Sequence, residues 1–242
     1  MSGARLGRYA VYQLRDYLMG RAVGFILFAL FLGWVTAKMM LGLDGRLPPG
    51  AERAAFGALA SQATTVLWLG VFLSAGSMVS NDRTTGAFRF LFAKPVGIPR
   101  FYGVLWLLHG ALFITIVALL IGLWSAIVTP VGAWPFVAWA ALMWMLWGSI
   151  VFFFSTLLKQ DWLCAGVLLA VASLVQGLLD HDGLWYRALA PVLPPIAHFD
   201  LVQSALLRGT AVPLADLAWV VIYGAAFLAA GLAVLRRRPM GA

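Results

Sequence analysis

Six long runs of apolar residues, separated by stretches that hold most of the charge, form the main pattern of this chain. They cover about residues 22–41, 64–79, 102–128, 134–158, 162–179 and 217–235, and the fifth run is the shortest. Each approaches the ~20 residues that a helix needs to cross the hydrocarbon core of a bilayer. Segments such as "LLHGALFITIVALLIGLW" are apolar on every side and lack the alternation of a barrel strand. The pattern predicts an all-α integral membrane protein with six transmembrane helices in one domain, 1–242.

A different pattern precedes the first run, in residues 5–20. At 100° per residue, Leu6, Leu14 and Tyr17 fall on one arc of a helix, while Arg8 and Arg15 fall on the other. Such a helix lies in the membrane interface, with its apolar face among acyl chains and its arginines among headgroups. We therefore predict an interfacial helix on the cytoplasmic surface, which serves either as a simple anchor or in gating.

Composition and charge agree with a membrane protein and give it an orientation. The chain is 63% hydrophobic and 11% charged, against about a quarter charged in soluble domains. Of the 17 Lys and Arg residues, 12 fall in the termini and in the loops that six spans place on the same side as the termini. The positive-inside rule then puts both termini in the cytoplasm. Because the net charge of +8 is spread over membrane-flanking segments, it gives no reason to expect a nucleic-acid partner.

The sequence holds few residues that could carry catalytic or metal chemistry. Cys164 is the only cysteine, and the three histidines show no metal-ligand spacing. There is no G-x-S-x-G, and no lysine sits in a G-x-x-x-x-G-K-[ST] phosphate-binding loop. We therefore predict no catalytic residue, no metal and no cofactor bound by this chain, and an intramembrane enzyme is the least favoured class.

The stretch "SNDRTTGAFRFLFAKPVGIPRFYG", residues 80–103, joins the second and third spans. A helix is predicted from Thr84 to Lys94, because Thr84 or Thr85 can act as N-cap and the proline at 95 ends it. Phe88 shares one face of this helix with two further apolar residues, whereas Phe90 and Gly86 point the other way. An exposed ring flanked by Arg89 and Lys94 is typical of a docking surface. The alternative is that Phe90 packs on the N-terminal helix of its own chain.

Polar residues inside the predicted spans are few. The candidates for a transport pathway are Thr64, Ser74, Ser77, His109 and Gln176. Ionisable and amide groups within a membrane often mark such pathways. Hydroxyl residues also serve as helix-packing contacts, and a histidine or glutamine can make a local hydrogen bond, so both interpretations stay open.

The order of these features resembles the permease subunits of type-2 ABC exporters. Members of that family have six spans, an amphipathic N-terminal helix and a loop pattern E-x-x-x-G-T-x-x-x-L-L-x-x-P-x-S/P-R. Asp82, Gly86, Phe90 and the prolines at 95 and 99 stand here in similar positions, although alanine replaces the usual threonine after Gly86. The Pro-rich segment "LAPVLPPIAHFDLVQSALLRG", within residues 180–216, and the last span with "YG" near its middle are also similar to the family. A short helix is predicted within that segment, at about 198–207.

The resemblance implies a subunit that moves a substrate across the cytoplasmic (inner) membrane of a prokaryote. It implies a dimer with a second permease subunit, identical or paralogous, in contact with membrane lipid. Two separate ABC ATPase subunits would bind ATP and Mg²⁺ and dock on an ATPase-coupling element, which here comprises Asp82, Arg83, Gly86, Phe88, Arg89, Phe90 and Lys94. The alternative is a non-transporting anchor or scaffold subunit, which would share the docking loop.

Overall fold

The computed structural model describes residue 15 and residues 17–42, 47–76, 78–85, 97–158, 160–178 and 193–237. Within these ranges the chain forms helices and no strand, so the predicted all-α class is confirmed. Two of the helical segments are π-helices, labelled η. The elements are η1 (Leu18–Ala22), α2 (Val23–Leu41), α3 (Glu52–Ala75), α4 (Ser80–Thr85), α6 (Ile98–Ile127), α7 (Trp134–Met143), η2 (Trp144–Gly148), α8 (Ser149–Leu157), α9 (Asp161–Leu178), α11 (Ile196–Arg208) and α12 (Leu214–Arg237).

Five helices among the described residues are long and apolar enough to cross a membrane, and they make the chain a multi-pass membrane protein. They are α2, α3, α6, the continuous helix α7–η2–α8, and α12. The fifth predicted span, 162–179, corresponds to α9, whose apolar part, Leu163–Gly177, is shorter than the five candidate spans. Its 18 residues rise about 27 Å, slightly less than the ~30 Å of a hydrocarbon core.

Two helices begin earlier than the apolar runs predicted. α3 begins at Glu52, not near residue 64, because the stretch "ERAAFGALASQA" is rich in alanine and favours a helix although it is less apolar. α6 begins at Ile98, not near residue 102, because Pro99 lies in its first turn, where the missing N–H costs nothing.

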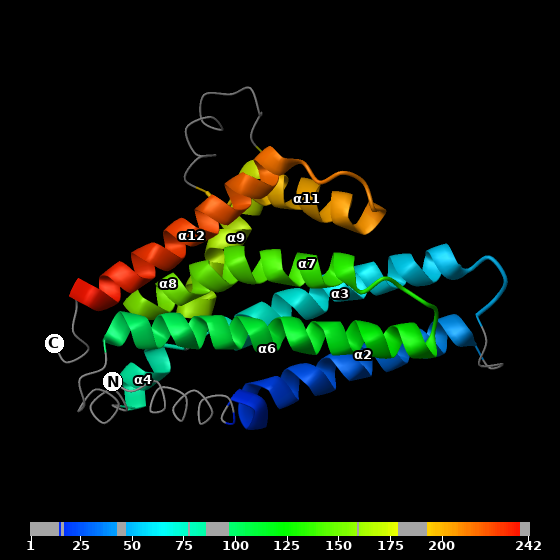
Figure 1. Ribbon diagram of the computed structural model, residues 1–242, viewed down its shortest axis with the longest axis horizontal. Coiled ribbons are helices and arrows are strands. Elements are labelled where there is room, and N and C mark those ends of the chain that lie inside the picture. The colour runs from blue at the N-terminus through cyan, green and yellow to red at the C-terminus, as the bar shows by residue number, and fades with distance from the viewer. Residues whose placement is uncertain are drawn as a thin grey trace.

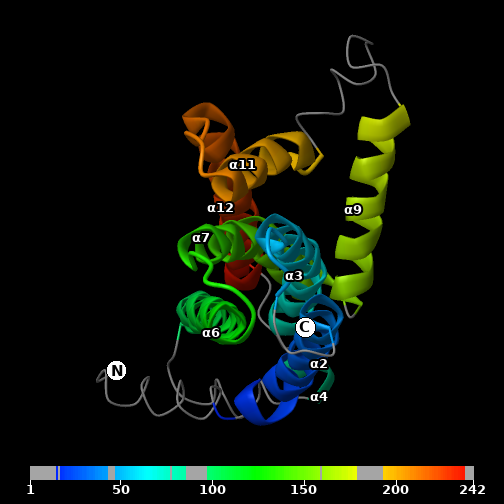
Figure 2. The same ribbon diagram turned by 90° about the vertical axis from the view of Figure 1, so that its right-hand side faces the viewer.

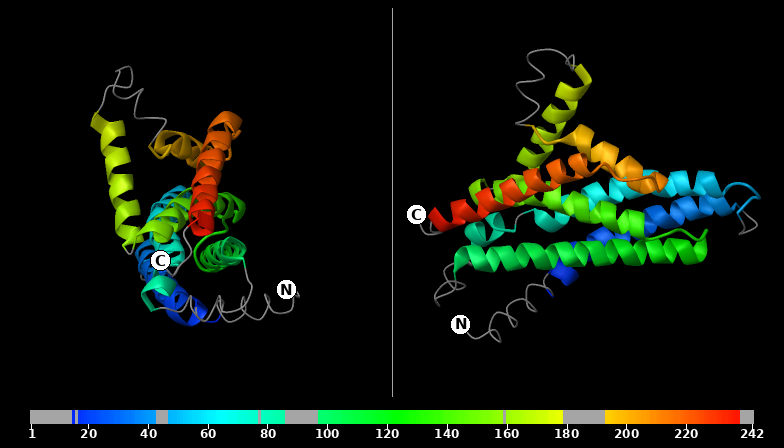
Figure 3. Two further views of the ribbon diagram at one scale, coloured as in Figure 1. Left: turned by 90° about the vertical axis from the view of Figure 1, so that its left-hand side faces the viewer. Right: turned by 45° about the horizontal axis from the view of Figure 1, so that its top comes forward.

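The long helices lie side by side, and α9 departs from them. In Figure 1, α2, α3, α6 and α7 run along the long axis of the molecule. Seen along that axis in Figure 2, α6 and α3 are nearly end-on while α9 stands across them. Both views of Figure 3 also show α9 rising away from the other helices, beginning where α8 ends. α9 is therefore the peripheral helix of the bundle.

Two close approaches show that α12 and the second half of the fourth span run in the same direction. A Cβ added at Gly224 would lie 2.3 Å from the carbonyl oxygen of Met145, and one at Gly231 would lie 2.9 Å from the ring of Phe152. Gly224 and Gly231 are seven residues apart on α12, and their neighbours Met145 and Phe152 are also seven residues apart, in the same order, on η2 and α8. The two helices pack in parallel, and the chain between them must return to the far end of the bundle.

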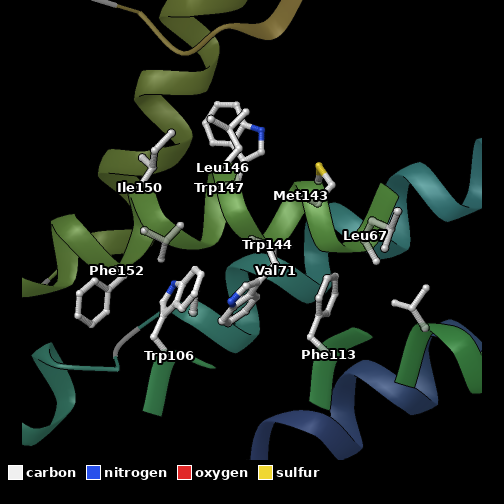
Figure 4. Packing of buried hydrophobic residues seen from close by; sticks show 14 of the residues in the cluster. Leu67, Val71, Trp106, Phe113, Met143, Trp144, Leu146, Trp147, Ile150 and Phe152 are labelled. Atoms are coloured by element: carbon white, nitrogen blue, oxygen red, sulfur yellow. The ribbon is translucent and has the colours of Figure 1, made fainter. Parts of the chain in front are cut away.

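The centre of the bundle is aromatic. Figure 4 shows Trp106 and Phe113 of α6 pointing toward Trp144 of η2, with ring centroids 5.7 and 5.8 Å from that of Trp144. Trp144 fits against α6 because residue 110 is glycine, where an added Cβ would lie 2.3 Å from the indole nitrogen. Trp147 is also buried and contacts the ring of Trp68. These tryptophans therefore pack in the core.

The helix predicted at about 198–207 is present as α11, from Ile196 to Arg208. It ends at Gly209, which adopts a left-handed conformation with φ +66° and donates its N–H to the carbonyls of the last turn. His198 of α11 and Asp216 of α12 lie 2.5 Å apart and tie the two helices together.

Candidate functional site

The candidate site lies where α3 ends and the chain turns into α4. α3 ends at Ala75, and Gly76 adopts an extended backbone conformation with ψ 146°. The N–H of Gly76 still bonds to the carbonyl of Phe72, at 2.9 Å. A short helix, α4, then begins at Ser80, whose side chain is buried. The break redirects the chain between a membrane-spanning helix and the segment that leads to residues 86–96.

Three buried side chains meet at the end of α3. The hydroxyl groups of Tyr17 and Ser74 are hydrogen-bonded to each other. The imidazole Nδ1 of His109, from α6, lies 3.1 Å from the backbone carbonyl oxygen of Ser74, so it donates to that oxygen when it carries the proton. The rings of Tyr17 and His109 are 4.6 Å apart between centroids. Since at most 5% of each side chain's surface is exposed, the hydrogen bonds join the segment before α2 to both α3 and α6 away from solvent.

A second contact joins α4 to the beginning of α6. The phenol of Tyr102 donates a hydrogen bond of 2.7 Å to the carboxylate Oδ2 of Asp82. Tyr102 is fully buried, while Asp82 is partly buried on the short helix. A hydrogen bond to a charged acceptor is stronger than one between neutral groups. The hydrogen bond therefore joins α4 to the beginning of α6.

We call Tyr17, Ser74, Asp82, Tyr102 and His109 the polar hinge. Its hydrogen bonds connect three separate parts of the chain: the segment before α2, the α3–α4 junction and the first half of α6. The imidazole of His109 contacts the backbone carbonyl oxygen of Ser74, which holds α6 against the end of α3. The described residues contain no cluster of His, Cys, Asp or Glu that could hold a metal ion. The arrangement is suited to positioning helices.

The structure brings some of the predicted site residues together and separates others. Asp82, Ser74 and His109 belong to the polar hinge, and Arg83 lies on α4 beside Asp82. Thr64 donates to the backbone carbonyl of Ala60 in its own helix. Gln176 lies near the end of α9 that points away from α6 (Figure 2). Ser77, Gly86, Phe88, Arg89, Phe90 and Lys94 lie outside the described residues.

Two residues of the polar hinge were not predicted. Tyr17 was expected among acyl chains on the apolar arc of the N-terminal helix, but it is buried against Ser74 and His109. The one signal in the sequence is a hydroxyl group on an arc otherwise made of leucine and alanine. Tyr102 was taken only as the first residue of a span. Its bond to Asp82 depends on how α4 folds back, which no local pattern specifies.

Residues 84 and 85, the predicted N-cap of the docking helix, belong to α4. The Thr84 hydroxyl donates to the carbonyl of Asn81 three residues earlier, at 2.9 Å, a contact made inside a helix. The remainder of the predicted helix, 86–94, lies outside the described residues.

No protein-family model matches the chain, and no curated protein matches its sequence.

Proposed function

We propose that this chain is the membrane-spanning permease subunit of an ATP-driven exporter in the inner membrane of a prokaryote. In this proposal the termini are cytoplasmic, two permease subunits pair, and two separate ATPase subunits dock on the segment that follows α4. The ATPases, not this chain, bind ATP and Mg²⁺. The loop pattern within residues 80–103 and the six apolar runs support the proposal.

The observation that carries the proposal is the position of the polar hinge. The predicted docking residues continue directly from α4, and Asp82 of α4 is hydrogen-bonded to Tyr102 of α6. A force applied to α4 by a partner would reach the third span through that bond. It would reach the end of α3 through the few residues that separate the two helices. Closure of the ATPases could thus tilt two spans together and change access to the pathway.

The buried contacts among Tyr17, Ser74 and His109 add a second connection. Tyr17 ties the segment before α2 to α3 and to His109 of α6. Tyr17 is part of the predicted helix 5–20, most of which lies outside the described residues, and in this proposal that helix moves with the same two spans. This favours a role in gating over the simple-anchor interpretation of residues 5–20.

Co-purification tests the proposal directly. The chain is expressed with candidate ATPases, transferred to nanodiscs and purified, as the native sequence and as Phe90→Asp. We expect an ATPase to co-purify with the native chain and to be lost from Phe90→Asp. Trp134→Asp is the control, because Trp134 is 73% exposed at the start of α7, at the end of the bundle away from α4. It should retain the ATPase.

The possible outcomes separate the alternatives. Failure of every candidate ATPase to bind would favour the non-transporting anchor. Binding that survives Phe90→Asp would place Phe90 against its own chain, as in the second interpretation of that residue. Binding without any change in ATP hydrolysis or substrate flux would also favour a scaffold subunit.

A further inference from the structure

An apolar pocket of about 360 Å³ lies between α2, α3 and α6. It lies toward the end of the bundle where α2 leads to α3 and α6 leads to α7 (Figure 1), whereas the polar hinge lies at the opposite ends of α3 and α6. Its volume falls in the range of ligand pockets, about 300–1,000 Å³. None of its lining residues is charged.

The mouth of the pocket opens toward lipid. Trp34 of α2 and Ile127 of α6 line it and are 60% and 57% exposed. Both belong to helices long and apolar enough to cross the membrane, so their exposed surfaces face acyl chains. A ligand must therefore arrive through the bilayer.

Two polar groups lie in this apolar setting. Gln62 of α3 donates to the backbone carbonyl of Leu32 in α2, at 3.1 Å. The indole nitrogen of Trp124 is buried with almost no accessible surface, so the apolar part of the ring, not the N–H, lines the open space of the pocket. The pocket thus favours a long apolar group such as an acyl chain.

The position of Trp124 on α6 gives the depth of the pocket in the membrane. Trp124 lies three residues before the end of α6, which corresponds to about 5 Å along the axis. This is the level at which tryptophan is enriched in membrane proteins, next to the headgroups. Lys38 follows Trp34 by four residues on α2, so it lies on the same side of that helix one turn nearer its end. A cation at that place complements a lipid phosphate.

We propose that this pocket binds one phospholipid of the surrounding membrane. One acyl chain lies among the three helices, and the phosphate lies near Lys38. The bound lipid fills the space between α2 and the rest of the bundle, and so holds in place a helix that has few buried residues of its own. The proposal does not depend on the ATPase partner.

Gly33 offers a substitution that fills the pocket without disturbing the fold. It lines the pocket, and an added Cβ there would meet no atom within 4 Å. Gly33→Leu therefore occupies the acyl-chain position and favours the helix over glycine. Gly24→Leu is a matched control, because Gly24 lies on the same helix, also has no atom within 4 Å, and does not line the pocket.

Native mass spectrometry measures the binding. Delipidated protein is titrated with a synthetic phosphatidylethanolamine that carries two oleoyl chains. We expect the native chain and Gly24→Leu to bind one lipid tightly and Gly33→Leu to lose about tenfold or more in affinity, since several methylene contacts disappear. Lipid should also raise the melting temperature of the native chain and leave that of Gly33→Leu unchanged.

Three outcomes would overturn the proposal: no tight lipid on the native chain, equal binding by Gly33→Leu, or equal loss in the Gly24→Leu control. If instead a second copy of the chain covers the pocket, Gly33→Leu would change the dimer fraction at constant lipid content. That result would also count against a lipid site.

Discussion

Single glycines allow the closest helix contacts in this bundle. At Gly70, Gly110, Gly224 and Gly231 an added Cβ would come within 3 Å of a neighbouring atom. At three of these positions the neighbours under 3 Å belong to aromatic side chains and not to backbone. At Gly224 the nearest atom is the backbone carbonyl oxygen of Met145, 2.3 Å away, which cannot move without displacing η2. Gly224 is therefore the position least able to accept a side chain.

Gly224→Ala should destabilise the protein by about 1–3 kcal/mol, because overpacking against backbone forces α12 away from η2. The measurement is equilibrium unfolding in mixed micelles. Gly122→Ala is the control, since an added Cβ at that exposed position of α6 meets nothing within 4 Å. That variant should gain about 0.5–1 kcal/mol from helix propensity. Equal stability of the two variants would contradict the close packing of α12 on η2.

Asp200 of α11 predicts a pH dependence of stability. Partial burial raises the pKa of its carboxyl group above the ordinary value. Below the unfolded-state pKa, about 3.9, the group is protonated in both states and folding carries no penalty. As the pH rises past the folded-state pKa the group is charged in both states, and the folded state carries the cost of partly desolvating that charge, which solvent reduces because the side chain of Asp200 is exposed.

Asp200→Asn removes this cost. Its melting temperature should exceed that of the native chain at neutral pH, and the difference should shrink as the pH falls toward 4. Melting curves of both proteins across that range provide the test, and other titrating groups cancel in the difference. A native chain as stable as the variant at neutral pH would show that the carboxyl group is well solvated.

At the scale of the elements, the sequence predicted the spans and α11 but only part of the polar hinge. Apolar runs located the spans because burial in lipid demands continuous hydrophobicity, and the Pro-rich segment indicated α11. The polar hinge was found only in part, because Ser74 and His109 are notable in the sequence as polar residues in apolar runs. Tyr17 and Tyr102 are not notable, since their partners lie 57 and 20 residues away and depend on the tertiary fold.

The bond between α4 and α6 gives a prediction at this scale. Tyr102→Phe keeps the ring and removes the donor to Asp82. In a double-mutant cycle with Asp82→Ala, we expect a coupling free energy of about 1.5–3 kcal/mol, the usual contribution of a hydrogen bond to a charged group. If α4 transmits force from an ATPase, Tyr102→Phe should also reduce the effect of this chain on ATP hydrolysis while the ATPase still binds.

Tyr223→Phe serves as the matched control for that variant. It makes the same chemical change on α12, where Tyr223 packs against Phe227. It should leave the effect on ATP hydrolysis unchanged. A cycle with no coupling between Asp82 and Tyr102 would remove the link between α4 and the third span.

For the whole molecule, the parallel packing of α12 on η2 and α8 decides the topology. Two helices that run in the same direction through one membrane require the chain between them to cross back. The segment between α8 and α12 contains α9 and α11 as described helices, and α9 alone has nearly the length of a bilayer core. α9 stands across the bundle in this structure (Figure 2), yet the connectivity demands a return crossing. We therefore expect an even number of crossings.

Reporter fusions test this expectation. Green fluorescent protein, which fluoresces when it stays in the cytoplasm, should be bright at the N-terminus, at the C-terminus and when inserted at residue 160, between α8 and α9. Alkaline phosphatase, which is active only when exported, should be active when inserted after Thr210, between α11 and α12. An exported C-terminus would mean that α9 does not cross and that the termini lie on opposite sides. In that case α12 would not end on the same side of the membrane as α4. The orientation on which ATPase docking depends would then be wrong.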